Sequence, residues 1–557
     1  MVREYIGARY VPKFIGLYDP TQSYEALCVV DNGSGTSYIS KIPTPAGTPL
    51  TDTTHWFVYG ASSGAIIALQ NDVNDLKNDI KGIVITPSMF GAVGDGTTDD
   101  SQAVQDAFNY AKSIGCALVS FTDISTITFK DVIIDSSCDI FFGDCEVKAM
   151  KIDSNNERTE NLFTIANQSI NVTFHDGVFV GGYSTGTNID PMNPKTAIEI
   201  DGANMIVFDG CFFKNFNNRN HVSIPTLLTD RKGIIANIHD VRDTIISNCK
   251  FDNCYGEELM YVLNNTLTRK EVNLLINNSR FTNIGTTVIN FVGNVVELAA
   301  NYYNINYAGS LANIFGLYVD VHDDYVDGSL ANVYDTCEET YFQNNSVSIR
   351  NVYIANANRA AMTAALEVEA DNIMIGDVRD ANYATVVMCR PGYLSSNPVI
   401  HPDQATSNIS QNIVKVKNCD ASMGNSKVTF VHHAFAITGL KKIEITNCVS
   451  DVHLANSEPI IIDNGGYINV NDSILYTRTL SSIGGSFFAF PIAPAASFNG
   501  LIMKGCNIKN NNTSNAEYVV RASTGIPYII SACIADGSSD VGDVLNNAVV
   551  NGCINIA

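Results

Sequence analysis

The sequence predicts an all-β protein whose main part is a solenoid of stacked β-coils. A short phrase, in which a small or polar residue precedes Cys and a short alternating run, recurs mostly at intervals of about 20 to 38 residues, as in irregular solenoids. Within one repeat, residues 197–201 (AIEID) alternate between apolar and acidic side chains. This alternation indicates strands with one buried and one solvent-facing side. At 557 residues the chain is long enough for such a solenoid and a smaller domain.

Residues 1–62 are predicted to form a separate small β module. The segments 5–12, 24–30 and 36–41 read as short strands separated by Gly, Pro and Asn turns. The only tryptophan, Trp56, is expected to anchor the core of this module, and a platform for sugar stacking is the alternative.

Residues 63–84 have the period of a short coiled coil. The apolar side chains follow one another at alternating intervals of three and four: Ile66, Leu69, Val73, Leu76, Ile80 and Ile83. β-branched residues at both seam positions favour three strands, so this segment is interpreted as a trimeric neck. A single amphipathic helix packed on its own chain is the alternative.

The stretch 85–111 is where the solenoid is expected to begin. Residues 83–85 read as a short strand, 90–100 as a glycine-rich acidic loop and 100–112 as an amphipathic helix. Asp99 is predicted to cap this helix together with Gln102, and Gly115 is predicted to end it.

The run from Phe90 to Ala107 (FGAVGDGTTDDSQAVQDA) resembles the opening motif of the pectate-lyase-like superfamily. The resemblance implies a right-handed parallel β-helix over residues 85–557, a fold common among phage tail spikes and polysaccharide depolymerases. Residues 1–62 are in turn similar to small β modules at the start of phage tail proteins. Together these likenesses imply a homotrimeric tail spike or tail fibre, attached to other virion tail proteins through residues 1–62 and engaging bacterial surface polysaccharide.

The motif itself carries no catalytic residue, so it leaves the reaction open. A phosphate-binding loop is excluded because no Lys follows the glycines. A calcium loop formed by Asp95, Thr97 and Asp99 lacks the glycine and the distal glutamate of such sites. We therefore expect neither a metal nor a cofactor.

The repeated phrase aligns the solenoid coils on its second residue. The 14 cysteines are mostly found there, which favours reduced thiols packed as small apolar groups over disulfides or metal ligands. The aligned residues are Cys145, Val178, Cys211, Cys249, Ser279, Val352, Asp377, Cys419, Cys448, Ser473, Cys506, Cys533 and Cys553.

Residues ten to twelve positions before each phrase are expected to share one outward wall suited to a glycan. Acids, tyrosines and histidines supply hydrogen-bonding groups and flat rings for sugars. The predicted substrate-binding residues are Glu199, Asp201, His239, Tyr261, Tyr318, His322, Asp323, Asp324 and Arg390.

Glu367, Glu369 and Asp320 are the candidate catalytic residues. Outward carboxylates two residues apart, or on neighbouring rungs, lie about 5 to 7 Å apart, within the range that glycoside hydrolysis requires. Glu257 and Glu258 are alternative acids, and a lyase using Arg242 or Arg390 as base is an alternative reaction. The preferred function is hydrolysis of surface polysaccharide, with a non-catalytic receptor-binding or structural tail protein as the main competitors.

The net charge of −23 argues against nucleic acid and anionic membranes as partners. No apolar run reaches membrane-spanning length, and the N-terminal residues lack the apolar core of a signal peptide. We therefore expect synthesis in a host cytoplasm, and the resemblance to phage tail proteins implies a place in the virion tail.

Overall fold

The computed structural model describes residues 12–34, 36–61, 84–149, 161–182, 196–216, 233–256, 258–263, 271–307, 309–328, 330, 332–335, 346–356, 359–363, 365, 367–377, 384–389, 413–421, 428–433, 440–452, 460–462, 465–477, 486–489, 500–510, 518–521, 528–531, 533–536, 548–551 and 554–556. The chain separates into two units, Met1–Val84 and Ile85–Ala557. Across the described residues, no helix is long and apolar enough to span a membrane.

The first unit contains a four-stranded sheet in the order β1 (Lys13–Leu17), β2 (Cys28–Asp31), β3 (Thr36–Ser40) and β4 (Trp56–Ala61). β1 pairs with β2 in parallel, and the other two pairs are antiparallel. The sequence predicted β2 and β3 but missed β1 and β4. Residues 5–11 and the predicted neck, apart from Val84, lie outside the described residues.

Trp56 anchors the core of this unit, as predicted. Its side chain is 2% exposed and packs against Tyr24, Cys28 and Val30. The rings of Tyr18 and Tyr24 lie 5.8 and 5.3 Å from the indole. A buried indole is not available as a platform for sugar stacking.

The second unit begins with the 3-10 turn η2 (Pro87–Phe90) and the helix α2 (Ser101–Ile114). The predicted apolar face of α2 is buried, and Gly115 ends the helix with φ of 66°. The predicted N-cap was wrong by one residue: Asp100 is the N-cap, and its carboxylate accepts hydrogen bonds from the amides of Val93 and Gly94 at 2.7 and 3.1 Å. The glycine-rich loop is therefore folded around a buried acid at the helix start.

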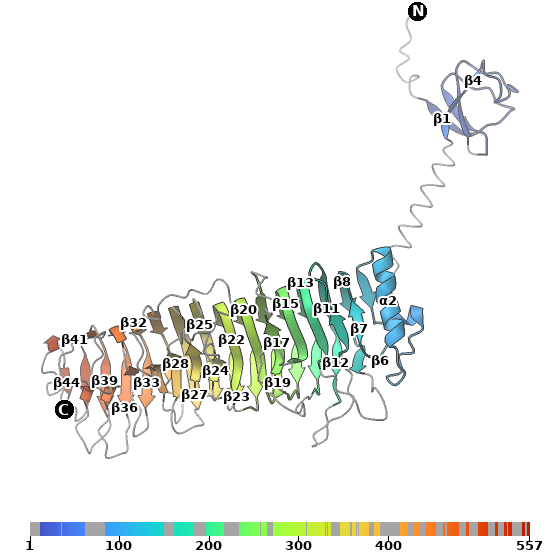
Figure 1. The fold of residues 1–557 in the computed structure, drawn as a ribbon. Coiled ribbons are helices and arrows are strands. Elements are labelled where there is room, and N and C mark those ends of the chain that lie inside the picture. The colour runs from blue at the N-terminus through green and yellow to red at the C-terminus, as the bar shows by residue number, and fades with distance from the viewer. Residues whose placement is uncertain are drawn as a thin grey trace, which may run out of the picture. The chain divides into compact units, whose positions relative to one another are not determined.

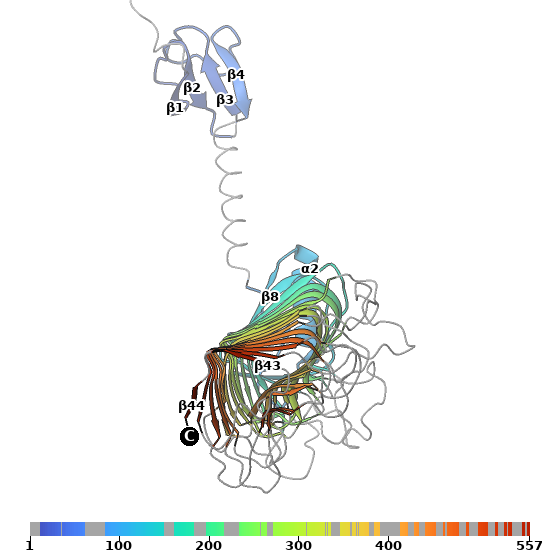
Figure 2. The ribbon, with the colours of Figure 1, turned by 90° about the vertical axis from the view of Figure 1, so that its left-hand side faces the viewer.

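The rest of this unit is a stack of parallel coils, which confirms the predicted class of fold. In the ribbon the coils follow one another in chain order from α2 to β44 (Figure 1), and their strands superimpose in the view turned by 90° (Figure 2). Each coil contributes to three parallel faces, here numbered in the order in which the chain passes through them from Val132 onward.

Six strands are long enough to run through two faces. β13 (Ile198–Asp209), β15 (Gly233–Ser247), β20 (Thr287–Ala299) and β22 (Ser310–His322) begin in face 1 and end in face 2. β25 (Ser346–Asn356) and β27 (Glu367–Asp377) begin in face 2 and end in face 3.

The shorter strands each belong to one face. Face 1 contains β7 (Val132–Ile134), β10 (Phe163–Ile165), β17 (Glu258–Leu263), β24 (Asn332–Asp335), β26 (Arg359–Thr363), β28 (Ala384–Cys389), β31 (Val428–His433), β34 (Ile460–Ile462), β37 (Ser486–Ala489) and β40 (Tyr518–Arg521). Face 2 contains β5 (Leu118–Ser120), β8 (Cys138–Phe141), β11 (Asn171–His175), β18 (Asn273–Asn277), β29 (Ile413–Lys417), β32 (Leu440–Thr446), β35 (Gly465–Asn471), β38 (Gly500–Lys504), β41 (Tyr528–Ser531) and β43 (Ala548–Asn551). Face 3 contains β6 (Thr126–Phe129), β9 (Glu146–Ala149), β12 (Val178–Val180), β14 (Phe212–Lys214), β16 (Lys250–Asp252), β19 (Arg280–Ile284), β21 (Tyr302–Ile305), β23 (Tyr325–Gly328), β30 (Asp420–Ala421), β33 (Val449–Val452), β36 (Ile474–Thr477), β39 (Asn507–Asn510), β42 (Ile534–Asp536) and β44 (Ile554–Ile556).

A left-handed residue turns the chain from face 2 to face 3, and it is the first residue of the repeated phrase. Asn, Asp and Gly tolerate this conformation best. Several of the Asn side chains also bond from coil to coil, as where Asn278 Nδ2 donates to Asn248 Oδ1 at 2.6 Å. The residues with positive φ at this turn are Asp176, Gly210, Asn248, Asn278, Ala300, Asp323, Asn351, Asn372, Asn418, Asn447, Asp472 and Gly505.

The next residue of each phrase points into the coil stack and is buried. The described cysteines are free, and all of them except Cys116 are buried, which confirms the prediction of packed thiols. Strand register corrects the alignment at two places, because Gly177 and Ile373 occupy this column in place of Val178 and Asp377. It also adds Asn301 and Asp324, which the phrase did not identify. Cys553 lies outside the described residues.

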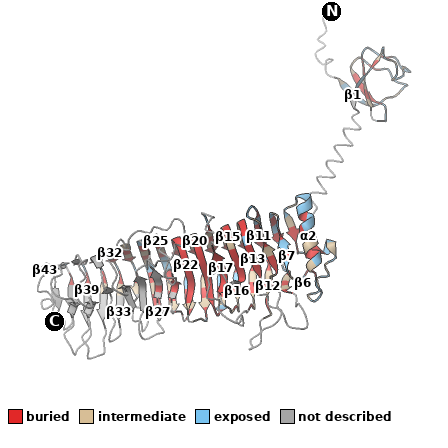
Figure 3. Ribbon diagram, in the orientation of Figure 1, coloured by how far each residue is buried: buried red, intermediate tan, exposed pale blue. Residues whose placement is uncertain are grey.

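Stacked aromatic rings fill part of the interior. Phe213, Phe251, Phe281 and Tyr303 lie on successive coils, with neighbouring ring centroids 4.6 to 5.2 Å apart and interplanar angles of 14° or less. Buried residues dominate the coils from β11 to β22 (Figure 3). The alternation predicted for residues 197–201 is confirmed, since Ile198 and Ile200 are fully buried and Asp201 is exposed.

Candidate functional site

The predicted wall is not one surface. Register places Glu199, Asp201, His239 and Tyr261 on face 1, whereas Tyr318, Asp320 and His322 lie at the end of β22 in face 2. Glu367 and Glu369 join the latter group. The prediction of a single wall was wrong because the long strands bend between two faces, so that counting back from each phrase reached different faces in different coils. Arg390 lies outside the described residues.

The group on face 2, here called the charged face, spans three adjacent strands. In register, Tyr318 is followed by Ser346 and Glu367, and Asp320 is followed by Ser348 and Glu369. Asp320 and Glu369 are therefore two rungs apart, about 9 to 10 Å between backbones. The two short serines separate longer side chains on either side. Tyr318 is 53% exposed, so its ring is available to a ligand.

Each candidate catalytic carboxylate is paired with a cation on the next strand. Arg350 donates to both oxygens of Asp320 at 2.9 and 2.7 Å. Lys415 bonds Glu367 and Lys417 bonds Glu369, both at 2.6 Å. The hydrogen bond from Lys417 lowers the pKa of Glu369. Glu369 is thus suited to act as a base or nucleophile in its ionised form, rather than as a proton donor.

His322 lies between two acids at the edge of this face. Its Nδ1 is 2.8 Å from Asp323 Oδ2, and its Nε2 is 3.3 Å from Glu297 Oε1. The contact with Asp323 is the main reason that the pKa of His322 is raised, and the same contact lowers the pKa of Asp323. The imidazolium form is favoured because both nitrogens face carboxylates.

Asp324 was predicted to extend the substrate-binding patch, and this prediction was wrong. The side chain occupies the buried column of the phrase and is 2% exposed. It accepts hydrogen bonds from the Asn301 amide at 2.8 Å and from the Tyr334 hydroxyl at 2.9 Å. Burial raises the pKa of Asp324 to about 7. Asp323, by contrast, is exposed, as predicted.

The group on face 1, here called the closed polar face, is a column of outward polar side chains on six successive strands. Its residues in register are Glu199, Asn237, Tyr261, Asn290, Asn313 and Asp335. Tyr261 and Asn290 are fully buried, which contradicts the predicted exposure of Tyr261 to substrate in the free chain. Glu258, an alternative acid in the sequence, is also buried and accepts a hydrogen bond from Asn290 Nδ2 at 3.2 Å.

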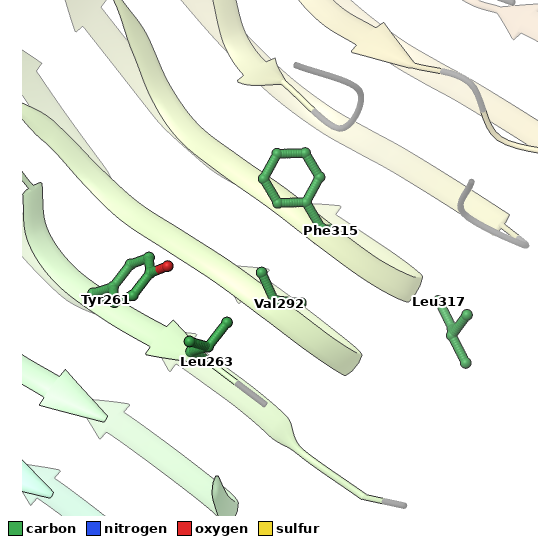
Figure 4. Packing of buried hydrophobic residues seen from close by; sticks show 5 residues of the cluster. All are labelled: Tyr261, Leu263, Val292, Phe315 and Leu317. Atoms are coloured by element: carbon green, nitrogen blue, oxygen red, sulfur yellow. The ribbon is translucent and has the colours of Figure 1, made fainter. Parts of the chain in front are cut away.

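An apolar cluster lies beside this column. Leu263, Val292 and Phe315 stand two residues after Tyr261, Asn290 and Asn313 on the same strands, and Leu317 completes the cluster (Figure 4). His239 contacts the ring of Tyr261 edge-on, with centroids 6.3 Å apart. The closed polar face therefore combines polar and apolar groups within one buried layer.

Sequence reasoning missed the cations of the charged face. Arg350, Lys415 and Lys417 alternate with apolar residues on their strands, which marks them as outward. Their partners become visible only once register is known, because 30 to 48 residues separate each pair in sequence.

No family model and no curated protein matches the sequence. Similar solved structures include tailspike protein 3 of bacteriophage CBA120, with 9% identity over 98% of this chain and 79% of that chain and a TM-score of 0.35. PfbA, a surface adhesin of Streptococcus pneumoniae, has 13% identity over 78% of this chain and 93% of that chain, with a TM-score of 0.36. An exopolygalacturonase of Thermotoga maritima has 11% identity over 76% and 92% of the two chains, with a TM-score of 0.32.

Proposed function

We propose that this protein binds a bacterial surface polysaccharide through the charged face, as the adhesive part of a phage tail spike or tail fibre. The observation that carries the proposal is the exposed ring of Tyr318, with Asp320 on the same strand and Glu367 two strands away on one outward surface. An aromatic ring flanked by hydrogen-bonding groups is the chemistry that sugars require. The virion setting, a homotrimer and attachment through residues 1–62 belong to the same proposal.

We further propose that the bound polysaccharide is hydrolysed, with Glu367, Glu369 and Asp320 as the catalytic carboxylates. Asp320 and Glu369 are two rungs apart, about 9 to 10 Å between backbones, which is close to the upper end of the 6.5 to 9.5 Å of an inverting pair. Glu369, held ionised by Lys417, would act as the base. His322, Asp323 and Tyr318 would contact the substrate beside it.

The test is incubation of the full chain with purified capsular and lipopolysaccharide glycans. New reducing ends would indicate hydrolysis, and unsaturated uronates would indicate a lyase. Retention of glycan without either product leaves a non-catalytic receptor-binding protein. The variant Tyr318→Ala should weaken binding at least tenfold, while Tyr110→Ala, which removes a 40% exposed tyrosine on α2, should not. Equal binding by both variants would rule out the charged face as the site.

A further inference from the structure

Face 3 carries a row of accessible side chains, one from each of five successive coils. The residues stand in register and are here called the face 3 ladder: Lys250, Arg280, Tyr302, Tyr325 and Tyr353. Lys250 and Arg280 are exposed, Tyr325 is 38% exposed, and the other two tyrosines are partly exposed. A ligand can therefore reach this row in the structure as it stands.

The two cations of the ladder lack acidic partners. Elsewhere on face 3, Lys148 and Lys214 both contact Glu146, at 3.3 and 2.8 Å. Lys250 and Arg280, by contrast, form no ion pair with any described residue. They are register partners on adjacent strands, about 4.8 Å apart between backbones, so their like charges repel each other. In a chain of net charge −23, an anion bound from outside would relieve this repulsion.

Arg280 is held in a position suited to a carboxylate. Its Cζ lies 4.6 Å from the centroid of the Tyr302 ring. Stacking on a ring fixes the plane of a guanidinium and leaves its in-plane N–H groups available. Among the described residues, none accepts a side-chain hydrogen bond from Arg280. A guanidinium oriented in this way can bind a carboxylate through two parallel hydrogen bonds.

The three tyrosines continue the row along the coil axis. The rings of Tyr302, Tyr325 and Tyr353 are stacked with neighbouring centroids 5.2 Å apart. Because the rings cover each other's faces, their edges and hydroxyls are the accessible parts. None of the three hydroxyls is bonded to a residue that the structure describes. Rungs about 4.8 Å apart have a spacing comparable to the length of one hexose unit, so a glycan along the coil axis would meet one hydroxyl per sugar.

Two acids beside the ladder limit where a negative charge can bind. Asp252 follows Lys250 on the same strand, but its Oδ1 accepts a hydrogen bond from Thr282 Oγ1 at 2.8 Å. Asp327 lies beside the tyrosines and accepts a hydrogen bond from Asn304 Nδ2 at 3.3 Å. An anionic sugar is therefore favoured at the two cations and repelled at the tyrosine end. This charge pattern fits a repeat in which uronates alternate with neutral sugars.

We propose that the face 3 ladder is a second carbohydrate site, in which Lys250 and Arg280 bind the carboxylate of a uronate and the tyrosine hydroxyls bind the neutral sugars that follow it. The inference rests on the proposed function, which it deepens by adding a site and a sugar class. The ladder and the charged face lie on different faces of the coil stack, so each can be altered with the other intact.

The test is binding of the full chain to a panel of purified neutral and uronate-bearing bacterial polysaccharides. Arg280→Gln and Lys250→Gln should each weaken binding at least fivefold for the uronate-bearing members that the wild type binds. Both side chains are exposed, so both variants should unfold at the temperature of the wild type or above it. Carboxyl reduction, which converts the uronates of these polysaccharides to neutral hexoses, should weaken binding by the wild type and abolish the difference between wild type and Arg280→Gln.

Lys504→Gln provides the matched control. Lys504 is also exposed and forms no ion pair within the described part of the chain, but it lies on β38 in face 2. This variant should bind the panel like the wild type, and an equal loss of binding in all three variants would overturn the assignment to the ladder.

The remaining outcomes separate the second site from the proposed function. If the wild type binds uronate-bearing members and neither Arg280→Gln nor Lys250→Gln weakens that binding, the second site is rejected. It is also rejected if carboxyl reduction leaves binding unchanged, or if the wild type binds neutral members alone. If Tyr318→Ala loses binding while the ladder variants do not, the charged face stands and the second site fails. If the wild type binds no polysaccharide, the proposed function fails with it.

Discussion

The hydroxyl of Tyr334 donates a 2.9 Å hydrogen bond to the carboxylate of Asp324 inside the coil stack. Asp324 stands where most coils place a cysteine or serine, directly after the left-handed Asp323. Tyr303 is nearby, and burial raises the pKa of its hydroxyl. Asn301, on the coil before Asp324, is also buried and polar, so the interior of the stack is polar over these two coils.

The buried Asp324 makes stability depend on pH. Its pKa is about 7 in the folded chain against 3.8 when exposed, so the folded state holds the proton more tightly. The stability that Asp324 contributes is therefore fully present below about pH 4. This contribution is lost as the pH rises through 7. The loss is at most about 4 to 5 kcal/mol, taking roughly 1.4 kcal/mol for each pKa unit.

Asp324→Asn should remove this dependence while keeping an acceptor for the Tyr334 hydroxyl. We expect the wild type to lose more unfolding free energy than the variant between pH 5 and pH 8, as measured by urea unfolding. Parallel curves for the two proteins over this range would show that Asp324 does not titrate there.

At the turn between faces 2 and 3 of the described coils, the left-handed residues are Asn, Asp or Gly, except for Ala300. Alanine in this conformation costs about 1 to 2 kcal/mol. Ala300→Asn should relieve this strain and place an amide between Asn278 and Asp323 of the neighbouring coils. We expect the free energy of unfolding to increase by about 1 kcal/mol and the thermal unfolding midpoint to rise with it. Ala300→Val, whose branched side chain is worse at positive φ, should lower the midpoint, and unchanged midpoints in both would contradict the turn geometry.

The sequence was sufficient to predict stacked coils, the helix at their start and the fate of the cysteines. These features depend on local chemistry: a left-handed turn favours Asn or Gly, and the inward residue after it is most often a small Cys or Ser. Asn301 and Asp324 were missed because they are polar, and only long-range register identifies them as inward. Tyr261 was wrongly predicted to be exposed. Alternation along a strand identifies a residue as outward, but it does not show whether that outward side chain is buried.

Lys417 provides a test of the role proposed for Glu369. Lys417→Met removes the hydrogen bond that lowers the pKa of Glu369, so that pKa should rise. If ionised Glu369 is the catalytic base, the acid limb of the pH profile of kcat/KM should move to higher pH. Lys442→Met is the control, because Lys442 pairs with Glu444 on its own strand. A profile shifted equally by both variants would argue against a specific role for Glu369.

Lys417 and Glu369 are both partly exposed, so variants of either residue should remain folded. Ion pairs at the surface contribute about 0 to 1 kcal/mol. Lys417→Met and Glu369→Gln should therefore change the unfolding free energy by less than about 1 kcal/mol. A larger loss of unfolding free energy, measured by chemical unfolding, would mean that the ion pair stabilises the coil stack. A loss of activity in these variants would then not assign Glu369 to catalysis.

Tyr325 stabilises the outside of face 3 by stacking on both neighbouring coils. Its ring lies 5.2 Å from that of Tyr302 and 5.2 Å from that of Tyr353, with interplanar angles of 3° and 17°. Each aromatic pair contributes about 0.5 to 1.5 kcal/mol, so Tyr325→Ala should lower the unfolding free energy by roughly 1 to 3 kcal/mol. Tyr325→Phe keeps both stacks and should be close to the wild type. Equal losses in the two variants would show that the hydroxyl, and not the stacked ring, is what this position contributes.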